Sequence, residues 1–214
     1  MRTMASDASG RPASVSACQC NALVLLMVLL LSSCSNTVVI PPESPREPVP
    51  VFLLDHGLHT SLVLPAPDGT MTRYAYGDWR YYAERKTGLG HAIAALSWPT
   101  ESALGRRHLP GPATEAAVRV QVRVGIQEVS SLWVEASRVA DLRGRLNSWF
   151  EQAPVLESPS VELGFVPYPH PYSLGHNSNT MIAHWLEDLG AEVSRKPLRA
   201  GWRIEGLAQS LPSW

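Results

Sequence analysis

The sequence predicts a small α+β domain in which an antiparallel sheet is packed by several helices. Short apolar runs alternate with turn residues between positions 49 and 76, as expected for strands joined by hairpins. Valines alternate with polar residues at positions 116–124, which is typical of a strand with one buried face. Apolar residues recur at helical spacing at 139–150 and 178–189, which indicates two amphipathic helices.

The chain begins with the features of a bacterial lipoprotein signal. Residues 22–31 (ALVLLMVLLL) form an unbroken apolar run, which is short for a membrane span but suits the core of a signal peptide. Small residues then lead directly to Cys34, in a pattern that resembles the lipobox at which signal peptidase cuts before the Cys. We therefore expect residues 1–33 to be removed. We expect a diacylglycerol on the Cys34 thiol and a further acyl chain, such as palmitate, on its new amino group, which together would anchor the protein stably to a membrane.

The residues after Cys34 suggest where this anchor lies. Ser35 follows, with no Asp at that position, which resembles an outer-membrane sorting signal in a Gram-negative cell. Residues 34–48 are rich in proline and read as an extended tether that leads to a domain at 49–214. A plain signal anchor is the alternative, but the small residues before Cys34 and the polar segment after it argue against it. We expect a lipid-anchored protein that faces the periplasm.

Charge and cysteine content exclude several function classes. The formal net charge of −1 gives no basic surface of the kind that nucleic acid requires. The cysteines are Cys18, Cys20 and Cys34, so the first two leave with the signal and the third is acylated. The mature domain then has no thiol for a disulfide, a cysteine-based zinc site or thiolate catalysis.

The first half of the domain reads as a set of short strands. We predict strands at 49–54, 60–64 and 70–76, with turn residues around Gly57 and at 65–69. Two short helices are expected next, at 80–86 and 89–96.

The second half mixes one strand with two helices. Residues 116–124 (AAVRVQVRV) are predicted to form a strand, and 139–150 a helix for which Ser137 is a plausible cap. Residues 154–171 are punctuated by proline and predict a long ordered loop. A helix follows from Ser178, and the tail from 197 contains a possible final turn.

The start of that last helix allows two interpretations. Asn177, Ser178 and Asn179 are residue types that cap free backbone N–H groups, so they could form an ordinary cap. A helix N-terminus also places a small polar side chain in a positive field, which stabilises a nucleophile or a bound anion. His59 heads an apolar strand, where a histidine is usually structural. However, a His at the head of a strand and a small nucleophile at a helix start are also the two parts of a papain-like site.

Three short motifs carry a resemblance to a known family. Residues 55–65 (DHGLHTSLVLP) are similar to a G-x-H-T-x-hydrophobic-hydrophobic-L-P motif, and residues 74–82 (YAYGDWRYY) are similar to G-W-G-D-x-x-F-Y. Residues 172–180 (YSLGHNSNT) resemble a Y-S-L motif followed by C-N-T-W. These motifs occur in an uncharacterised family of small bacterial lipoproteins that has been noted near urease genes. The resemblance runs from about residue 51 to residue 190 and implies a circularly permuted papain-like fold, because His59 precedes Ser178 in the chain.

The sequence departs from that family at the nucleophile, because Ser178 stands where the pattern has Cys. A helix field can help to ionise a thiol, but a serine hydroxyl needs a hydrogen-bonded base that is oriented by a third group. We expect His59 to be the base and Asp78 to orient it, although Asp78 could instead cap the following helix. Asn177 and Asn179 could donate side-chain N–H groups to an oxyanion or serve as caps.

The remaining histidines and the choice of function stay open. His176 lies beside the Asn-Ser-Asn turn, where it could line a substrate pocket or replace His59 as base. Asp55, His56 and His59 resemble metal ligands by type but lack zincin spacing, so we expect no metal and no cofactor. The sequence fits a Ser/His hydrolase or acyltransferase that acts on an envelope substrate such as peptidoglycan peptides or lipid-linked acyl groups. It also fits a silent binding module for envelope peptide or glycan, or a purely structural lipoprotein.

Overall fold

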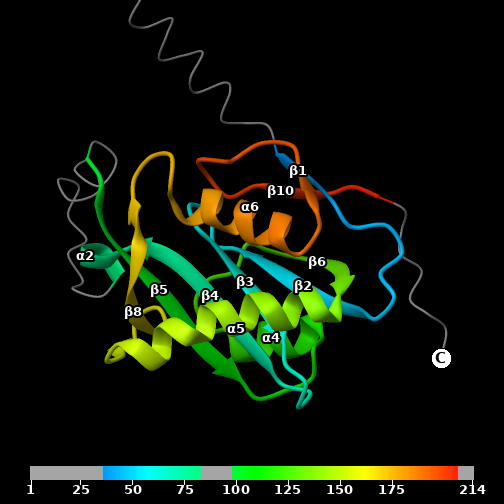
Figure 1. Cartoon of the computed structure of the whole chain (residues 1–214), viewed down its shortest axis with the longest axis horizontal. Coiled ribbons are helices and arrows are strands. Elements are labelled where there is room, and N and C mark those ends of the chain that lie inside the picture. Colours follow the sequence, from blue (N-terminus) through cyan, green and yellow to red (C-terminus); the bar gives the residue numbers. More distant parts are fainter. Residues whose placement is uncertain (1–35, 83–97, 207–214) are drawn as a thin grey trace, which may run out of the picture. The chain divides into compact units, whose positions relative to one another are not determined.

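The computed structural model of the chain describes residues 36–82 and 98–206. The predicted signal peptide, Cys34 and the helix predicted at 89–96 therefore lie outside the described residues, as do residues 83–86 of the helix predicted at 80–86. Within residues 36–82 and 98–206, a large antiparallel sheet and four helices confirm the α+β class (Figure 1). No helix within the two described ranges is long and apolar enough to cross a membrane.

The main sheet has seven strands in the order β6-β2-β3-β4-β5-β8-β7, and every neighbouring pair is antiparallel. Its strands are β2 (Pro48–Asp55), β3 (Thr60–Pro65), β4 (Met71–Asp78), β5 (Thr100–Leu109), β6 (Glu128–Glu135), β7 (Leu156–Ser158) and β8 (Leu163–Tyr172). The strands predicted at 49–54, 60–64 and 70–76 are thus confirmed as β2, β3 and β4. All eight residues of β4 are buried, because the sheet is covered on both faces at its centre.

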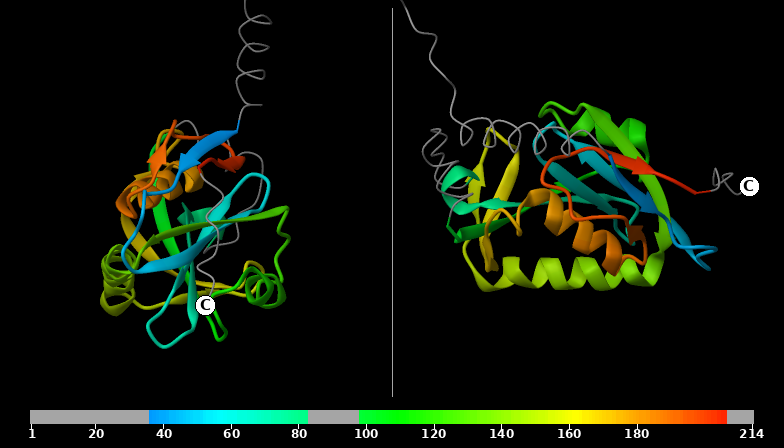
Figure 2. Two further views of the ribbon diagram at one scale, coloured as in Figure 1. Left: turned by 90° about the vertical axis from the view of Figure 1, so that its right-hand side faces the viewer. Right: turned by 90° about the horizontal axis from the view of Figure 1, so that it is seen from above.

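Two helices cover one face of this sheet and a third covers the other (Figure 2). Helices α5 (Ala136–Gln152) and α6 (Ser178–Asp188) share a core with β2, β3 and β4. Helix α4 (Glu115–Gln121) packs on the opposite face against Phe52, Val63 and Met71. The short helix α2 (Trp79–Tyr82) follows β4 directly.

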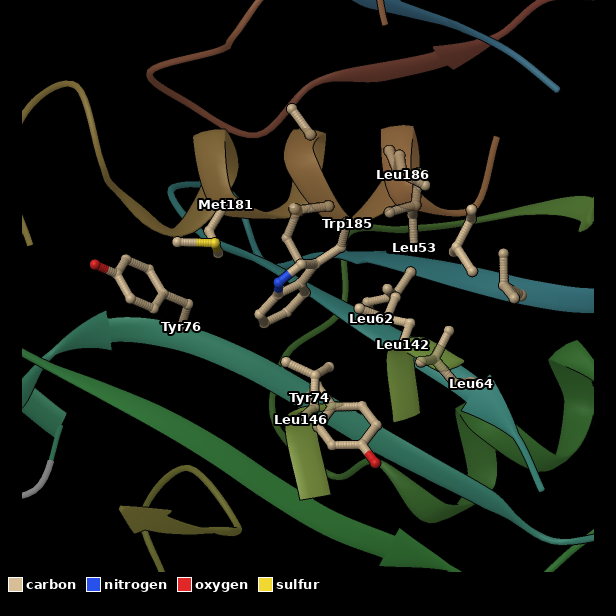
Figure 3. Packing of buried hydrophobic residues seen from close by; sticks show 14 of the residues in the cluster. Leu53, Leu62, Leu64, Tyr74, Tyr76, Leu142, Leu146, Met181, Trp185 and Leu186 are labelled. Atoms are coloured by element: carbon tan, nitrogen blue, oxygen red, sulfur yellow. The ribbon is translucent and has the colours of Figure 1, made fainter. Parts of the chain in front are cut away.

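The larger core lies between α5, α6 and the sheet. Trp185 and Leu186 of α6 point toward Leu53 and Leu62 of the sheet (Figure 3). All four side chains are at most 3% exposed. Burial of apolar side chains at this density is the main force that fixes α6, and with it Ser178, against β3.

A second, three-stranded sheet lies beside the first core. Its order is β10-β1-β9, formed by β1 (Thr37–Ile40), β9 (Glu192–Val193) and β10 (Trp202–Ile204). Strand β1 falls inside the segment that we predicted to be an extended tether. The folded part therefore starts before residue 49, because Val39 of β1 is fully buried in the larger core.

The strand predicted at 116–124 is wrong, because most of this segment is helix α4. The Thr114 side chain accepts a hydrogen bond from the backbone N–H of Ala117 and caps the helix. Val118 and Val122 lie four residues apart and are both buried, whereas Val120 between them is 78% exposed. Val118 and Val122 are four positions apart, which places them on one face of a strand and also on one face of a helix. The alternation of valines alone therefore could not decide between the two structures.

The long loop predicted at 154–171 is also wrong, because it contains β7 and most of β8. Pro167, Pro169 and Pro171 alternate along β8, so the N–H groups that proline lacks all fall on one edge of the strand. Strand β7 pairs with β8 only at residues 163–165, and beyond that point this edge has no partner strand in the described part of the chain. Prolines are tolerated at such an edge.

Candidate functional site

The N-terminus of α6 is held by a reciprocal capping box. The side-chain oxygen of Asn177 accepts hydrogen bonds from the backbone N–H groups of Asn179 and Thr180, at 2.9 and 3.1 Å. In return, the Thr180 hydroxyl accepts from the backbone N–H of Asn177 at 2.8 Å. The Asn177 amide donates to the Leu174 carbonyl oxygen. Asn177 therefore acts as a cap, and the oxyanion role that we considered for it is not supported because its side chain is already engaged.

Ser178 begins this helix and meets His59, the residue immediately before β3. The Ser178 Oγ lies 3.0 Å from Nδ1 of His59, within the distance that general base catalysis requires. In the tautomer with its proton on Nε2, the His59 ring accepts the hydroxyl hydrogen at Nδ1. The structure thus brings together the predicted nucleophile and the predicted base.

Asn179 connects the helix to both neighbours of His59. Its amide donates to the Leu58 carbonyl oxygen at 2.9 Å, and its side-chain oxygen accepts from the Thr60 hydroxyl at 2.8 Å. The Thr60 hydroxyl also accepts from the indole N–H of Trp202 at 2.8 Å. Asn179, Thr60 and Trp202 are at most 4% exposed. Asn179 is therefore a positioning residue for His59, and with both ends of its amide engaged it is not free to bind an oxyanion.

Asp78 does not orient His59, which corrects our sequence-based expectation. One carboxylate oxygen of Asp78 accepts from the backbone N–H of Tyr81 at 2.8 Å, and the other accepts from the Thr100 hydroxyl. Asp78 thus caps the start of α2, as the alternative interpretation held. Within residues 36–82 and 98–206, no carboxylate is hydrogen-bonded to the His59 ring.

Two tyrosines of α2 pack against the His59 ring. The ring of Tyr82 meets the His59 ring edge-on at a centroid distance of 5.6 Å, and Tyr81 lies at 6.1 Å. Burial among these groups lowers the pKa of His59 below its usual value of 6.5, so the ring is neutral at pH 7. Sequence reasoning missed Tyr81 and Tyr82 as site residues, although two adjacent aromatic residues after Asp78 were a visible signal.

Gly77 explains how Tyr82 reaches His59. A Cβ atom at Gly77 would overlap the Tyr82 ring, so this ring lies directly over the glycine. Tyr82 also stacks on Phe165 of β8 with a centroid distance of 5.5 Å. His59 is therefore held between α6, which carries Ser178, and an aromatic cluster at the end of β4.

The helix start also offers a backbone donor. Among the hydrogen bonds of the described residues, none involves the backbone N–H of Ser178. As the first residue of α6, Ser178 lies where free N–H groups and the helix dipole favour negative charge. This N–H is the available oxyanion donor at the site.

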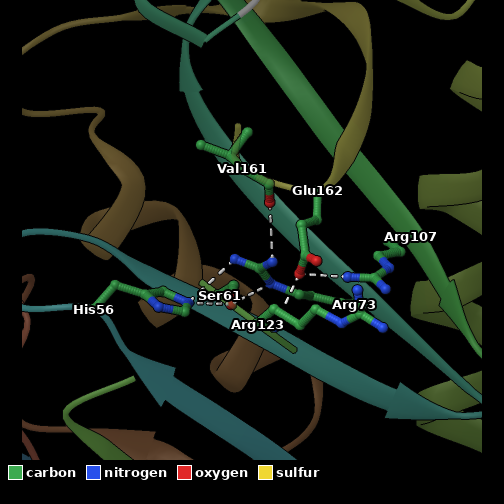
Figure 4. A network of polar contacts seen from close by, with 7 residues as sticks. All are labelled: His56, Ser61, Arg73, Arg107, Arg123, Val161 and Glu162. Carbon is green, nitrogen blue, oxygen red and sulfur yellow. Dashed lines mark hydrogen bonds and ion pairs between the residues drawn. The ribbon is translucent and has the colours of Figure 1, made fainter. Parts of the chain in front are cut away.

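A second Ser–His pair lies close in sequence but has a structural role (Figure 4). His56 Nδ1 is 2.7 Å from the Gly125 carbonyl oxygen, and its Nε2 is 2.9 Å from the Ser61 hydroxyl. The Nε of Arg73 donates to the same hydroxyl at 3.0 Å. Burial, together with the Arg73 charge, lowers the pKa of His56 to about 4. His56 is thus a neutral, partly buried histidine that joins β2, β3 and β4.

His176 lies away from the Ser178–His59 pair, in a row of stacked histidines. Its ring is nearly parallel to those of His170 and His184, at centroid distances of 6.4 and 6.1 Å. It therefore does not replace His59 as base, because the hydrogen bond of Ser178 goes to His59. His176 does line a cavity of about 480 Å³ between α5, α6 and β8.

In the described part of the chain, no metal site is formed around His56 and His59 or around the stacked rings of His170, His176 and His184. Within the described residues, no group of three or more His, Cys, Asp or Glu side chains is placed to hold a metal ion.

Comparison with protein-family models, with curated proteins and with solved structures gives no match for this chain.

Proposed function

We propose that this protein is an envelope lipoprotein whose domain cleaves, or transfers the acyl group of, an amide or ester with Ser178 as nucleophile and His59 as base. The observation that carries the proposal is the 3.0 Å contact between Ser178 Oγ and His59 Nδ1. A neutral, desolvated imidazole that is hydrogen-bonded to a hydroxyl at a helix N-terminus supports this proposal, because it supplies the nucleophile and the base of a serine site.

In this reaction, Ser178 Oγ attacks the substrate carbonyl carbon while its proton moves to Nδ1 of His59. The resulting oxyanion is stabilised by the backbone N–H of Ser178 and by the positive end of α6. His59 then gives the proton to the leaving nitrogen or oxygen as its bond to carbon breaks, which leaves an acyl-serine. Water or another acceptor, deprotonated by His59, takes the acyl group and restores the Ser178 hydroxyl.

The order of the two residues in the chain supports a circularly permuted papain-like fold. His59 precedes β3 and Ser178 opens α6, so the base comes before the nucleophile. The helix that carries Ser178 packs on one face of an antiparallel sheet. Peptidoglycan peptides and lipid-linked acyl groups are the envelope substrates that present amide or ester carbonyls to such a site.

A catalytically silent binding module is the second candidate, and specific observations favour it. Ser178 is 1% exposed, and the Asn177 and Asn179 side chains are fully engaged in holding the helix start. A serine in this setting can also be read as the remnant of a lost nucleophile. The domain would then bind an envelope peptide or glycan without cleaving it.

A serine-directed fluorophosphonate probe separates the two candidates. The catalytic proposal expects labelling of the intact protein, loss of the label in Ser178→Ala and retention in Ser131→Ala, which removes an exposed serine of β6. Labelling that survives Ser178→Ala would refute Ser178 as nucleophile. Absence of labelling in the intact protein, together with absence of iodoacetamide reaction in Ser178→Cys, would favour the binding module.

Anchoring through Cys34 is a separate part of the proposal and rests on the sequence. The apolar run at 22–31 and the small residues before Cys34 support cleavage and acylation there. The proposed location is the outer membrane, with the domain facing the periplasm.

A further inference from the structure

The cavity between α5, α6 and β8 has a lining that the Ser178–His59 pair does not use. Its floor is apolar and buried, and consists of Leu142, Leu146, Met181 and Trp185. Its rim is exposed and polar. The two kinds of surface meet in one open hollow that is large enough for part of an oligosaccharide or peptide.

One wall of this cavity is a continuous row of aromatic rings. Trp149 and Tyr168 meet at a centroid distance of 5.6 Å, and Tyr168 meets His170 at 5.5 Å. The parallel rings of His170, His176 and His184 continue the row across to α6. Ring faces and edges of this kind pack against the C–H faces of a flat, polar ligand.

The charged groups of the cavity cancel each other. Arg145 of α5 forms an ion pair with Asp188 of α6 at 2.6 Å, and both side chains are at least 42% exposed. A joined guanidinium and carboxylate offer donors and acceptors side by side, which suits vicinal hydroxyl groups. Burial lowers the pKa of His184, which is therefore uncharged at pH 7. Among the described residues that line the cavity, Arg145 and Asp188 are thus paired with each other, which favours an uncharged ligand over a strongly charged one.

We propose that this cavity binds an uncharged oligosaccharide that carries N-acetyl groups. The aromatic row takes the sugar faces, and the Arg145–Asp188 pair takes the hydroxyl groups. The apolar floor at Leu142, Leu146 and Met181 takes the acetamido methyl group, which an unsubstituted sugar lacks. The inference does not require Ser178 to be catalytic, because the cavity residues that would contact the sugar do not include Ser178 or His59.

The proposal is tested by calorimetry on the full chain in detergent. The probe is a β-1,4-linked tetramer of N-acetylglucosamine, and the comparison sugar is the corresponding glucose tetramer. We expect the first to bind and the second to bind at least about tenfold more weakly. Arg145→Ala and Trp149→Ala should each weaken binding of the probe at least about tenfold.

A matched control is the variant Arg119→Ala. Arg119 also forms an exposed helical ion pair, with Glu115, but on α4 at the opposite face of the sheet. The affinity of the Arg119→Ala variant for the probe should stay within about twofold of that of the unchanged protein.

If circular dichroism shows that Trp149→Ala does not fold, the variant His176→Ala, at the exposed rim of the cavity, replaces it. No measurable heat with millimolar probe, equal binding of both sugars, or binding that is insensitive to the cavity variants would overturn the inference. Fluorophosphonate labelling is measured separately, so failure of this proposal is distinguishable from failure of the catalytic one.

Discussion

Ser178 Oγ lies 3.0 Å from Nδ1 of His59, although the two residues are 119 positions apart in the chain. The contact forms because α6 packs its buried stripe on β3, and His59, the residue immediately before β3, lies against the first residue of the helix. Asn179 strengthens this arrangement from the neighbouring position of α6. The Ser–His pair is thus a product of packing between two elements, and its integrity can be tested through the residues that hold it.

Replacement of Asn179 by Ala should disconnect His59 from α6. The substitution removes the hydrogen bond from the Asn179 amide to the Leu58 carbonyl oxygen and the one from the Thr60 hydroxyl to the Asn179 side-chain oxygen. The Thr60 oxygen keeps the hydrogen bond that it accepts from Trp202, but the buried Thr60 O–H group loses its acceptor. We expect a loss of about 2–4 kcal/mol in the free energy of unfolding, measured with urea. Fluorophosphonate labelling should fall at least about tenfold, because a misplaced base no longer activates Ser178.

Asn147→Ala provides the control for this prediction. The Asn147 side-chain oxygen accepts from the Tyr74 hydroxyl and from Arg106, so its removal also unpairs partly buried groups. Neither of these hydrogen bonds involves β3 or α6. A comparable loss of stability with unchanged labelling is expected, whereas equal loss of labelling in both variants would show that Asn179 acts only through stability.

Gly77→Ala should displace Tyr82 and so release the other side of His59. The added methyl group would overlap the Tyr82 ring, which then has to leave its place against His59 and Phe165. We expect the pKa of His59, followed by NMR, to rise toward its usual value as burial decreases. Gly144→Ala is the matched control, since nothing lies near a Cβ there and α5 should gain about 0.5–1 kcal/mol. An unchanged His59 titration in Gly77→Ala would contradict the role given to Tyr82.

Acidification should destabilise the fold through His56. Its pKa is about 4 in the folded protein and 6.5 in an unfolded chain, so between these values the unfolded state binds more protons. The contribution is fully present above pH 6.5 and is lost as the pH falls toward 4. We expect a decrease on the order of 1–3 kcal/mol in the free energy of unfolding between pH 7 and pH 4.5.

The variant His56→Gln tests this assignment. The slope of stability against pH should flatten in this range, whereas His108→Gln, which changes an exposed histidine of β5, should keep the original slope. Identical slopes in both variants would mean that other groups control the acid response.

Cys34→Ala should abolish lipid attachment. Metabolic labelling with a palmitate analogue in a Gram-negative host is expected to modify the unchanged chain and to leave the variant unlabelled. Persistent labelling of Cys34→Ala would contradict the lipobox interpretation. A chain that carries Cys18→Ala and Cys20→Ala is the control and should retain the label, because both residues precede the expected cleavage point.

Several features could be predicted because they depend on local patterns. The apolar runs and turns between 49 and 76 were sufficient for β2, β3 and β4, and the helical stripe of 139–150 was sufficient for α5. His59 and Ser178 could be selected by residue type and by their places at the ends of elements. The valines at 116–124 led to a wrong prediction of a strand, because two buried residues that are four positions apart fit the spacing of a strand as well as that of a helix.

The sequence by itself determined the α+β class, the missing thiol of the domain and the two residues of the Ser–His pair. Only the tertiary structure decided how each neighbouring side chain is used. Asp78 caps α2, Asn177 and Asn179 hold the start of α6, and Tyr82 packs against His59. The physical reason is that a polar side chain acts through the partners it meets, and those partners come from distant segments that packing of the sheet and helices brings together.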